Sequence, residues 1–248
     1  MHVHIQSYWL AKAGNTPDEY EDAFWSDWTD RDTVAFRVAV ADGATEASFS
    51  RQWAKRLVRS YCNVTTAHQD LCQILPQIQK GWCRSVSARP LPWYAEAKLQ
   101  LGAYSSLVGL TIWEKELASG AARWEAIAVG DSCLFQVRDN QLLIAWPLSR
   151  PDQFNNRPLL ISTKPENNTH LAEQIARLPG DWESGDSFCL MTDALACWFL
   201  QKLDQGCKPG EVIPDFGSQT FSDWIADLRA SKQMRNDDVT LVKVHVDR

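Results

Sequence analysis

The stretch Val38-Ala39-Val40-Ala41-Asp42-Gly43-Ala44-Thr45-Glu46 decides how the rest of the chain is organised. Its apolar half predicts a buried strand over residues 33–41, and that strand stops at Asp42-Gly43. An amphipathic helix pattern follows over residues 53–61. A carboxylate at the end of a buried strand is held on a rigid element at the rim of a core. The glycine after it lets the backbone turn and lets another group approach closely.

Further carboxylates stand at the ends of other predicted elements. They are Asp193, Asp237, Asp238 and the pair Glu21-Asp22. Each also has a purely structural interpretation, because Asp-Gly is an ordinary turn signal and Asp193 can cap a helix. Since adjacent strand residues point to opposite faces, only one of Asp237 and Asp238 should face a given ion. Taken together, these carboxylates predict one convergent metal site.

The order of the predicted elements favours an α+β fold in one domain, residues 1–248, with antiparallel sheets covered by helices. Strands and helices come in separate blocks, and four successive strand candidates read as an antiparallel meander. Pro76 should kink or split the helix that contains it. The predicted strands are 3–10, 20–25, 33–41, 104–113, 121–129, 132–138, 141–146, 187–192 and 239–246; the predicted helices are 53–61, 71–82, 93–99, 171–178, 196–203 and 220–230.

Composition excludes several classes of protein. The chain has 248 residues and 45% hydrophobic content, enough for one sizeable core, and its net charge of −6 argues against general nucleic-acid binding. No stretch is apolar for the length of a membrane span, and no secretory leader is visible, so we expect neither a membrane partner nor export. The seven cysteines lack C-x-x-C spacing, which favours reduced thiols in a cytoplasmic protein over a zinc site.

The carboxylates predict a particular chemistry. Oxygen ligands from separate strand ends suit Mg²⁺ or Mn²⁺, and two such ions can clamp a phosphoryl group and activate a bridging hydroxide. No serine, cysteine or histidine nucleophile is then required. His2 and His4 share one side of the first predicted strand and are an alternative metal pair, against the plainer interpretation of exposed terminal residues.

Six short motifs, in this order, resemble those of the metal-dependent serine/threonine phosphatases of type 2C, over nearly the whole chain. They are Glu21-Asp22-Ala23-Phe24, Ala41-Asp42-Gly43, Gly102 to Leu107, Val129-Gly130-Asp131-Ser132, Gly185 to Asp193, and Asp237 to Val242. The resemblance implies a four-layer αββα sandwich of two mainly antiparallel sheets flanked by helices. It also implies hydrolysis of phosphoserine and phosphothreonine on proteins by a metal-bridging hydroxide.

The resemblance assigns roles to the carboxylates. Asp42 would bridge two Mg²⁺ or Mn²⁺ ions, the Gly43 carbonyl would bind one, and Asp193 and Asp237 would hold the second. Glu21 and Asp22 would act mainly through metal-bound waters. Asp131 would support the structure near the site or help to hold an additional, third ion. The partners implied are a phosphorylated protein substrate and a cognate Ser/Thr kinase or its targets.

The chain departs from the family pattern where the family grips phosphate. Members often carry an arginine shortly before the acidic pair, and no arginine precedes Arg31 here. Lys12 or Arg51 could substitute, although lysine offers a point charge without the bidentate fork. Ala194 and Cys133 replace a usual glycine and arginine. Two alternatives therefore remain: a phosphatase-like binding or regulatory module with weak or no catalysis, and a hydrolase of small phosphorylated metabolites.

Overall fold

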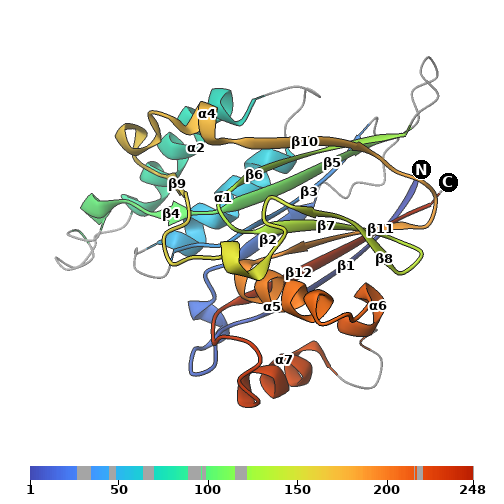
Figure 1. The fold of residues 1–248 in the computed structure, drawn as a ribbon. Coiled ribbons are helices and arrows are strands. Elements are labelled where there is room, and N and C mark those ends of the chain that lie inside the picture. The colour runs from blue at the N-terminus through green and yellow to red at the C-terminus, as the bar shows by residue number, and fades with distance from the viewer. Residues whose placement is uncertain are drawn as a thin grey trace.

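Two five-stranded antiparallel sheets form the centre of the molecule (Figure 1). The computed structural model describes residues 1–26, 35–44, 49–63, 70–88, 96, 99–114, 122–214, 216 and 220–247. The first sheet has the order β1 (His2–Leu10), β12 (Val239–Asp247), β11 (Asp186–Met191), β7 (Cys133–Arg138) and β8 (Gln141–Trp146). The second has the order β10 (Ala176–Asp181), β6 (Arg123–Val129), β5 (Leu107–Trp113), β3 (Ala35–Ala41) and β2 (Ala23–Ser26). A short pair, β4 (Tyr104–Ser105) and β9 (Ile161–Ser162), lies outside both sheets.

The alternation of β12 shows why the two sheets pack face to face. Val242, Val244 and Val246 are buried in a core shared with strands of the second sheet, whereas Lys243 and His245 are half-buried on the other face. In the sequence, the alternation of Val242, Val244 and Val246 with Lys243 and His245 predicts a strand with its valines facing a core, and the structure confirms this facing. Burial of one face of each sheet against the other supplies the largest apolar contact between them.

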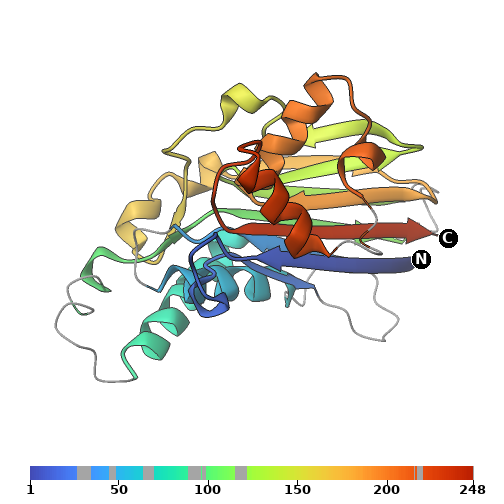
Figure 2. The same ribbon diagram turned by 90° about the horizontal axis from the view of Figure 1, so that it is seen from below.

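Helices cover the outer face of each sheet, which completes four layers in the order αββα (Figures 1 and 2). On the second sheet lie α1 (Ser50–Cys62) and α2 (Leu71–Val86), with α4 (Leu171–Gln174) beside them. On the first sheet lie α5 (Asp193–Asp204), α6 (Pro209–Val212) and α7 (Phe221–Ala230). Short 3-10 turns occur at η1 (Pro17–Glu19), η2 (Pro151–Gln153) and η3 (Pro165–Asn168). The predicted α+β class and layering are confirmed.

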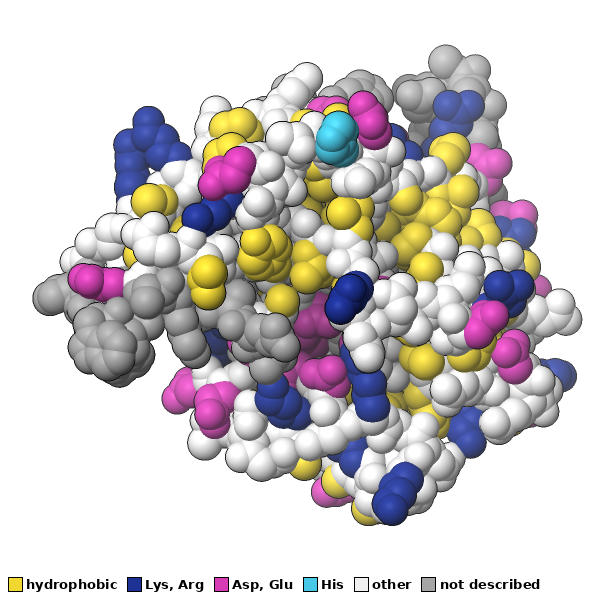
Figure 3. Space-filling view, turned by 60° about the vertical axis from the view of Figure 1, so that its left-hand side comes forward, with side chains coloured by type: hydrophobic (Ala, Val, Ile, Leu, Met, Phe, Trp, Pro, Cys, Tyr) yellow, Lys and Arg dark blue, Asp and Glu magenta, His cyan; other side chains and the backbone are white. Residues whose placement is uncertain are grey.

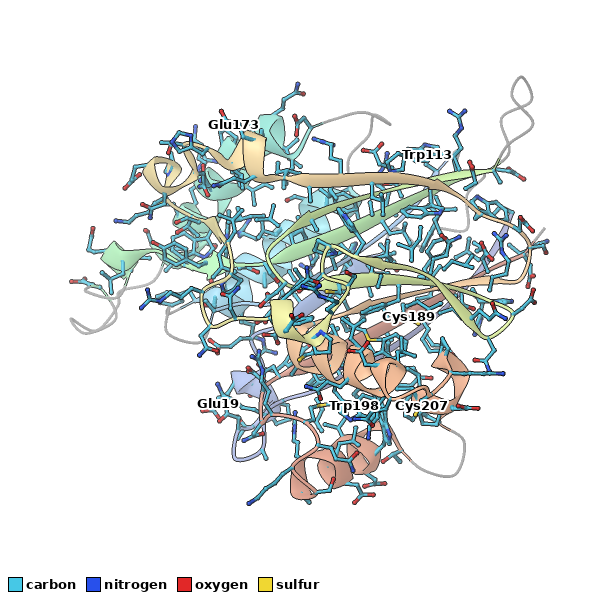
Figure 4. The ribbon with its side chains drawn as sticks, in the orientation of Figure 1. Glu19, Trp113, Glu173, Cys189, Trp198 and Cys207 are labelled. Atoms are coloured by element: carbon cyan, nitrogen blue, oxygen red, sulfur yellow. The ribbon has the colours of Figure 1, made fainter. Side chains whose placement is uncertain are left out.

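Aromatic packing fixes α5 to α7. Trp198 of α5 meets Trp224 of α7 edge to face, with ring centroids 5.3 Å apart. Figure 4 shows Trp198 projecting from α5 toward α7. Such pairs contribute about 0.5–1.5 kcal/mol beyond the area they bury.

Two sequence predictions about elements are wrong in part. The four strands between residues 104 and 146 are not one meander: β5 and β6 belong to the second sheet, and the chain crosses at Gly130 to form β7 and β8 in the first. The predicted helix 171–178 ends at Gln174, and β10 begins at Ala176. The helix α2 runs through Pro76 without splitting. Most of the predicted helix 93–99 lies outside the described residues.

Two other sequence expectations concern membranes and thiols. Across the part of the chain that the structure describes, every helix is too short or too polar to cross a bilayer. None of the seven cysteines forms a disulfide. The first and last strands are neighbours, with His2 opposite Asp247, so the two chain ends lie side by side (Figures 1 and 2).

Candidate metal and phosphate site

Three aspartates meet at one end of the sandwich, where strands of both sheets finish. Asp42 follows β3, Asp131 lies between β6 and β7, and Asp193 begins α5 directly after β11. One carboxylate oxygen from each lies within 4.8 Å of the others. Asp237, just before β12, lines the same cavity of about 730 Å³. The packing of the two sheets therefore brings together carboxylates that are far apart in the sequence.

Backbone hydrogen bonds hold the Asp42-Gly43 turn in place. The Asp42 carbonyl accepts the Ser106 N–H at 2.8 Å, and the Asp42 N–H donates to Ser106 Oγ at 3.1 Å. Ser106 Oγ in turn meets Ser132 Oγ at 2.7 Å, beside Asp131. A Cβ at Gly43 would lie 2.7 Å from the Glu21 carbonyl oxygen, so only glycine fits there.

The early acidic pair is divided by the structure. Asp22 is buried beside the cluster, and Thr240 Oγ1 donates to its Oδ2 at 2.7 Å. The Tyr20 hydroxyl lies 2.5 Å from the same threonine oxygen. Glu21 instead lies 3.9 Å from Lys12 Nζ and faces a different, smaller cavity.

Asp237 and Asp238 are divided in the same way. Asp237 lines the large cavity, while Asp238 is 5% exposed and accepts the backbone N–H groups of Lys12 and Glu21 at 2.8 and 2.6 Å. Asp238 thus ties the segment after β1 to the start of β12. Of this pair, only Asp237 lines the large cavity.

The concentration of negative charge changes the titration of the cluster. Burial raises the pKa of Asp42 to about 7, and the charges of Asp131 and Asp237 add to that effect. Burial is the main reason, and the charge of Asp42 the second, why the pKa of Asp22 lies well above its usual range. Burial also raises the pKa of Asp131. Carboxylates so close together stay ionised at neutral pH only if a cation accompanies them.

Two buried oxygens in the cluster have no hydrogen-bond partner among the described residues. They are Oδ1 of Asp22 and Oδ1 of Asp193. Unpaired buried carboxylate oxygens are costly, and a bound cation would satisfy them. The atoms that could bind a metal here are all oxygens, and oxygen ligands are the kind that Mg²⁺ and Mn²⁺ prefer. The residues present therefore fit a divalent metal.

Basic and amide side chains share the large cavity with the acids. Arg235 contacts the carboxylate of Asp193, and its Nη2 lies 3.1 Å from Oδ2 of Asp237. The cavity is also lined by Tyr104, Asn155, Asn156 and Arg157. Figure 3 shows acidic side chains gathered in a recess with basic side chains on its rim. The sequence analysis missed Arg235 and Arg157, because a single surface arginine carries no local signature.

Lys12 and Arg51, the sequence candidates for binding phosphate, do not line this cavity. With Glu21 they line a separate one of about 270 Å³. The Arg51 guanidinium donates to the Asp18 carbonyl and lies 3.6 Å from the Asp18 carboxylate. The structure thus keeps these two cations apart from Asp42, Asp193 and Asp237.

The alternative histidine site has a different geometry. His4 lies opposite His245 across β1 and β12, and His245 Nε2 lies 3.2 Å from Asp247 Oδ2. Within the described ranges, however, only Asp42, Asp131 and Asp193 bring three metal-ligating atoms within 4.8 Å of one another. The carboxylate cluster is the better metal site.

Comparison with known proteins gives both a family and a set of similar folds. A family model described as "Protein phosphatase 2C" matches residues 17–236. No curated protein sequence matches the chain significantly. A bacterial serine phosphatase has a TM-score of 0.63 and 14% identity over 99% of this chain and 98% of that one.

Two other solved structures are similar over almost their whole length. The catalytic domain of the serine/threonine phosphatase PstP, in complex with two manganese ions, has a TM-score of 0.56 and 13% identity over 99% of both chains. The phosphatase domain of SpoIIE from Bacillus subtilis has a TM-score of 0.54 and 16% identity over 100% of this chain and 93% of that one. At such identities the likeness concerns the fold.

Proposed function

We propose that this chain, which belongs to the protein phosphatase 2C family, hydrolyses phosphoserine and phosphothreonine on proteins in a metal-dependent reaction. The observation that carries the proposal is the meeting of Asp42, Asp131 and Asp193 within 4.8 Å in the lining of the 730 Å³ cavity. Two of the oxygens in this region are buried with no hydrogen-bond partner in the part of the chain that the structure describes. A cluster of this kind has no structural benefit without a cation.

Two Mg²⁺ or Mn²⁺ ions are the proposed cofactors. Asp42 would hold both, the Gly43 carbonyl would hold one, and Asp193 and Asp237 would hold the other. Asp131 would hold an additional ion or support the site. Bound there, the metal would act as a Lewis acid on the phosphoryl oxygens and lower the pKa of water. The two manganese ions of the similar PstP domain support this assignment.

The protein's own groups would orient this site. Thr240 holds Asp22 by a hydrogen bond to its Oδ2, and the Tyr20 hydroxyl contacts the same threonine oxygen. Asp22 would act through metal-bound water rather than as a direct ligand. The family resemblance implies the same role for Glu21, but we do not propose it for Glu21, because this residue lies beside Lys12 in the smaller cavity. The Ser106–Ser132 hydrogen bond joins the segments that carry Asp42 and Asp131, which limits their movement apart. Such preorganisation is the main contribution that a protein makes to electrostatic catalysis.

The remaining assignments are also proposals. Residues 1–248 would act as one phosphatase domain in the cytoplasm. Its partners would be a Ser/Thr kinase or the proteins which that kinase phosphorylates, so its role would lie in phosphorylation signalling. The similar bacterial serine phosphatase supports the phosphoserine class.

A manganese-dependent assay with p-nitrophenyl phosphate and a phosphoserine peptide tests the function. We expect activity that EDTA abolishes, and losses of at least about a hundredfold in Asp42→Asn and Asp193→Asn, because each removes a charged ligand. Asp204→Asn, an exposed change on the same helix as Asp193, is the matched control. Equal activity in the wild type and both variants would refute the proposal.

A second candidate is a phosphatase-like binding module without catalysis. The contact of Arg235 with Asp193 and Asp237 favours this candidate, because the Arg235 guanidinium then pairs with carboxylate oxygens that a metal would need as ligands. Calorimetry separates the two candidates. Absence of Mn²⁺ binding at millimolar metal would favour the module.

A further inference from the structure

We propose that Arg235 binds the substrate phosphate, with Arg157 of the same cavity, and that Arg235 and a divalent ion compete for Asp193 and Asp237. The inference rests on the proposed function and assigns the phosphate-binding role that the sequence left open. It concerns residues in a part of the chain where no family motif predicts an arginine.

The position of Arg235 is suitable for contact with a ligand. It lines the 730 Å³ cavity with all four aspartates of the site. Its side chain is 46% exposed, so the guanidinium can turn without displacing packed groups. The loop that carries it is anchored, because Arg229 of α7 donates to the Asp237 carbonyl at 2.5 Å. Arg235 is therefore a mobile cation on a fixed support.

The charge of the cavity explains why a phosphate needs this arginine. The four aspartates that line it carry four negative charges when ionised, which two divalent ions would neutralise. A phosphate dianion would then enter a site with no surplus positive charge unless the protein supplies it. Arg235 and Arg157 are the two cationic side chains among the described residues of this cavity. The planar guanidinium also matches phosphate oxygens in a bidentate manner, as lysine cannot.

Arg157 is placed to assist. Its side chain is exposed, and its backbone N–H donates to Asn155 Oδ1 at 2.8 Å, which shapes the loop at the cavity. Arg157 also lines an adjoining cavity of about 250 Å³ beside Gly130 and Asp131. Arg157 therefore borders both cavities that reach Asp131.

Competition follows from the contacts of Arg235. Its guanidinium lies on oxygens of Asp193 and Asp237 that a metal would also use. A metal that binds these oxygens removes the partners of Arg235 and leaves the guanidinium available to phosphate. Arg235 thus weakens metal binding and strengthens phosphate binding. A residue with only a structural role would not change the two affinities in opposite directions.

The test measures both affinities in Arg235→Ala. Titration of the substrate-free protein with Mn²⁺ by calorimetry should give a threefold to tenfold tighter dissociation constant, roughly the effect of one partly exposed ion pair. Inhibition of the manganese-loaded protein by inorganic phosphate should weaken by roughly tenfold to a hundredfold, the effect of one charge-assisted hydrogen-bonded contact. KM for p-nitrophenyl phosphate should rise more than kcat falls.

Matched variants sharpen the result. Arg235→Lys should keep part of the phosphate affinity, because the charge remains without the fork. Arg157→Ala should weaken phosphate inhibition but leave Mn²⁺ affinity unchanged. Arg150→Ala is the control, since Arg150 is exposed, pairs with Asp152 and lines neither cavity.

Three outcomes would overturn the inference: both constants unchanged in Arg235→Ala, both changed in the same direction, or a larger loss of phosphate inhibition in Lys12→Ala or Arg51→Ala. Failure of the proposed function is a separate result, because it would appear as a wild-type protein without manganese-dependent hydrolysis. In that case the calorimetric comparison and direct binding of phosphate to the manganese-loaded protein still decide between support and refutation.

Discussion

At the scale of single residues, the buried carboxylates cost the metal-free protein stability. Asp131 is 5% exposed and lies within reach of Asp42 and Asp193. Asp131→Asn should therefore raise the free energy of unfolding in EDTA by about 1 kcal/mol, because it removes one of several repelling charges. Urea denaturation measures this change. Asp204→Asn on the exposed side of α5 should change nothing, and a less stable Asp131→Asn protein would contradict the prediction.

Asp42 should also make stability depend on pH. Its pKa is raised to about 7 in the folded protein, against about 3.9 in an unfolded chain. Between these values the folded state binds more protons than the unfolded state, so stability in EDTA falls as pH rises from about 4 to 7 and then levels off. Asp42→Asn should flatten this fall. Thermal unfolding of both proteins across the range checks the sign, and parallel curves would refute it.

At the scale of elements, two glycines should respond oppositely to alanine. Gly43→Ala places a Cβ 2.7 Å from the Glu21 carbonyl and 3.0 Å from the Ser50 backbone, which cannot move without shifting β2 or α1. We expect a loss of about 1–3 kcal/mol in unfolding free energy and weaker Mn²⁺ binding.

Gly81→Ala is the matched control within α2. Its Cβ would meet only the end of the flexible Arg56 side chain, at 2.9 Å. Alanine in a helix interior should then stabilise by about 0.5–1 kcal/mol. Chemical denaturation compares the two variants. Equal effects would show that the close approach at Gly43 carries no cost.

Elements whose residues alternate regularly between apolar and polar could be predicted from the sequence. Elements whose conformation depends on the strands packed beside them could not. The strand β12 shows clear alternation, so its facing was predictable. The strand β10 contains Pro179-Gly180, which reads as a turn. It is tolerated because β10 is an edge strand and because Gly180 makes room for the Trp124 ring. The residues between β6 and β7 carry no sequence signal that distinguishes a hairpin turn from a connection between two sheets. The sequence therefore does not predict that the chain passes from the second sheet to the first at Gly130.

The site divides in the same way. The aspartates could be predicted because each ends a recognisable apolar run. Their cationic partners could not, because Arg235 and Arg157 lie in irregular segments and reach the cavity only through the tertiary fold. Lys12 and Arg51, the candidates that the sequence offers in place of the missing arginine, line the neighbouring cavity instead.

At the scale of the whole molecule, the site depends on the packing of one sheet against the other. Asp42 follows β3 of the second sheet, and Asp193 begins α5 just after β11 of the first sheet, so a bound metal would tie the two sheets together. Mn²⁺ should therefore raise the temperature of global unfolding. At a Mn²⁺ concentration of a hundred times its dissociation constant, the free energy of unfolding should increase by about 2.7 kcal/mol. Differential scanning calorimetry measures this effect. The double variant Asp42→Asn/Asp193→Asn should show no rise.

Phe188 provides a separate test of the contact between sheets. It is fully buried there, with its ring 5.6 Å from that of Trp124. Phe188→Ala should cost about 3–5 kcal/mol through the cavity it leaves. Because no ligand is changed, the stabilisation by Mn²⁺ should persist in the folded fraction. If Phe188→Ala is less stable and is also no longer stabilised by Mn²⁺, the core contact and metal binding are not independent, and the prediction is wrong.

The neighbouring chain ends have a consequence for anything attached to them. β12 begins beside Asp237 and ends opposite His2, so the site and the termini are separated by the length of a nine-residue strand, on the order of 30 Å. A protein fused to either end would start on the far side from the cavity. A flexible tether would need about thirty residues for its average span to reach the entrance. Shorter tethers would deliver a fused substrate poorly, so tether length could set the rate of dephosphorylation.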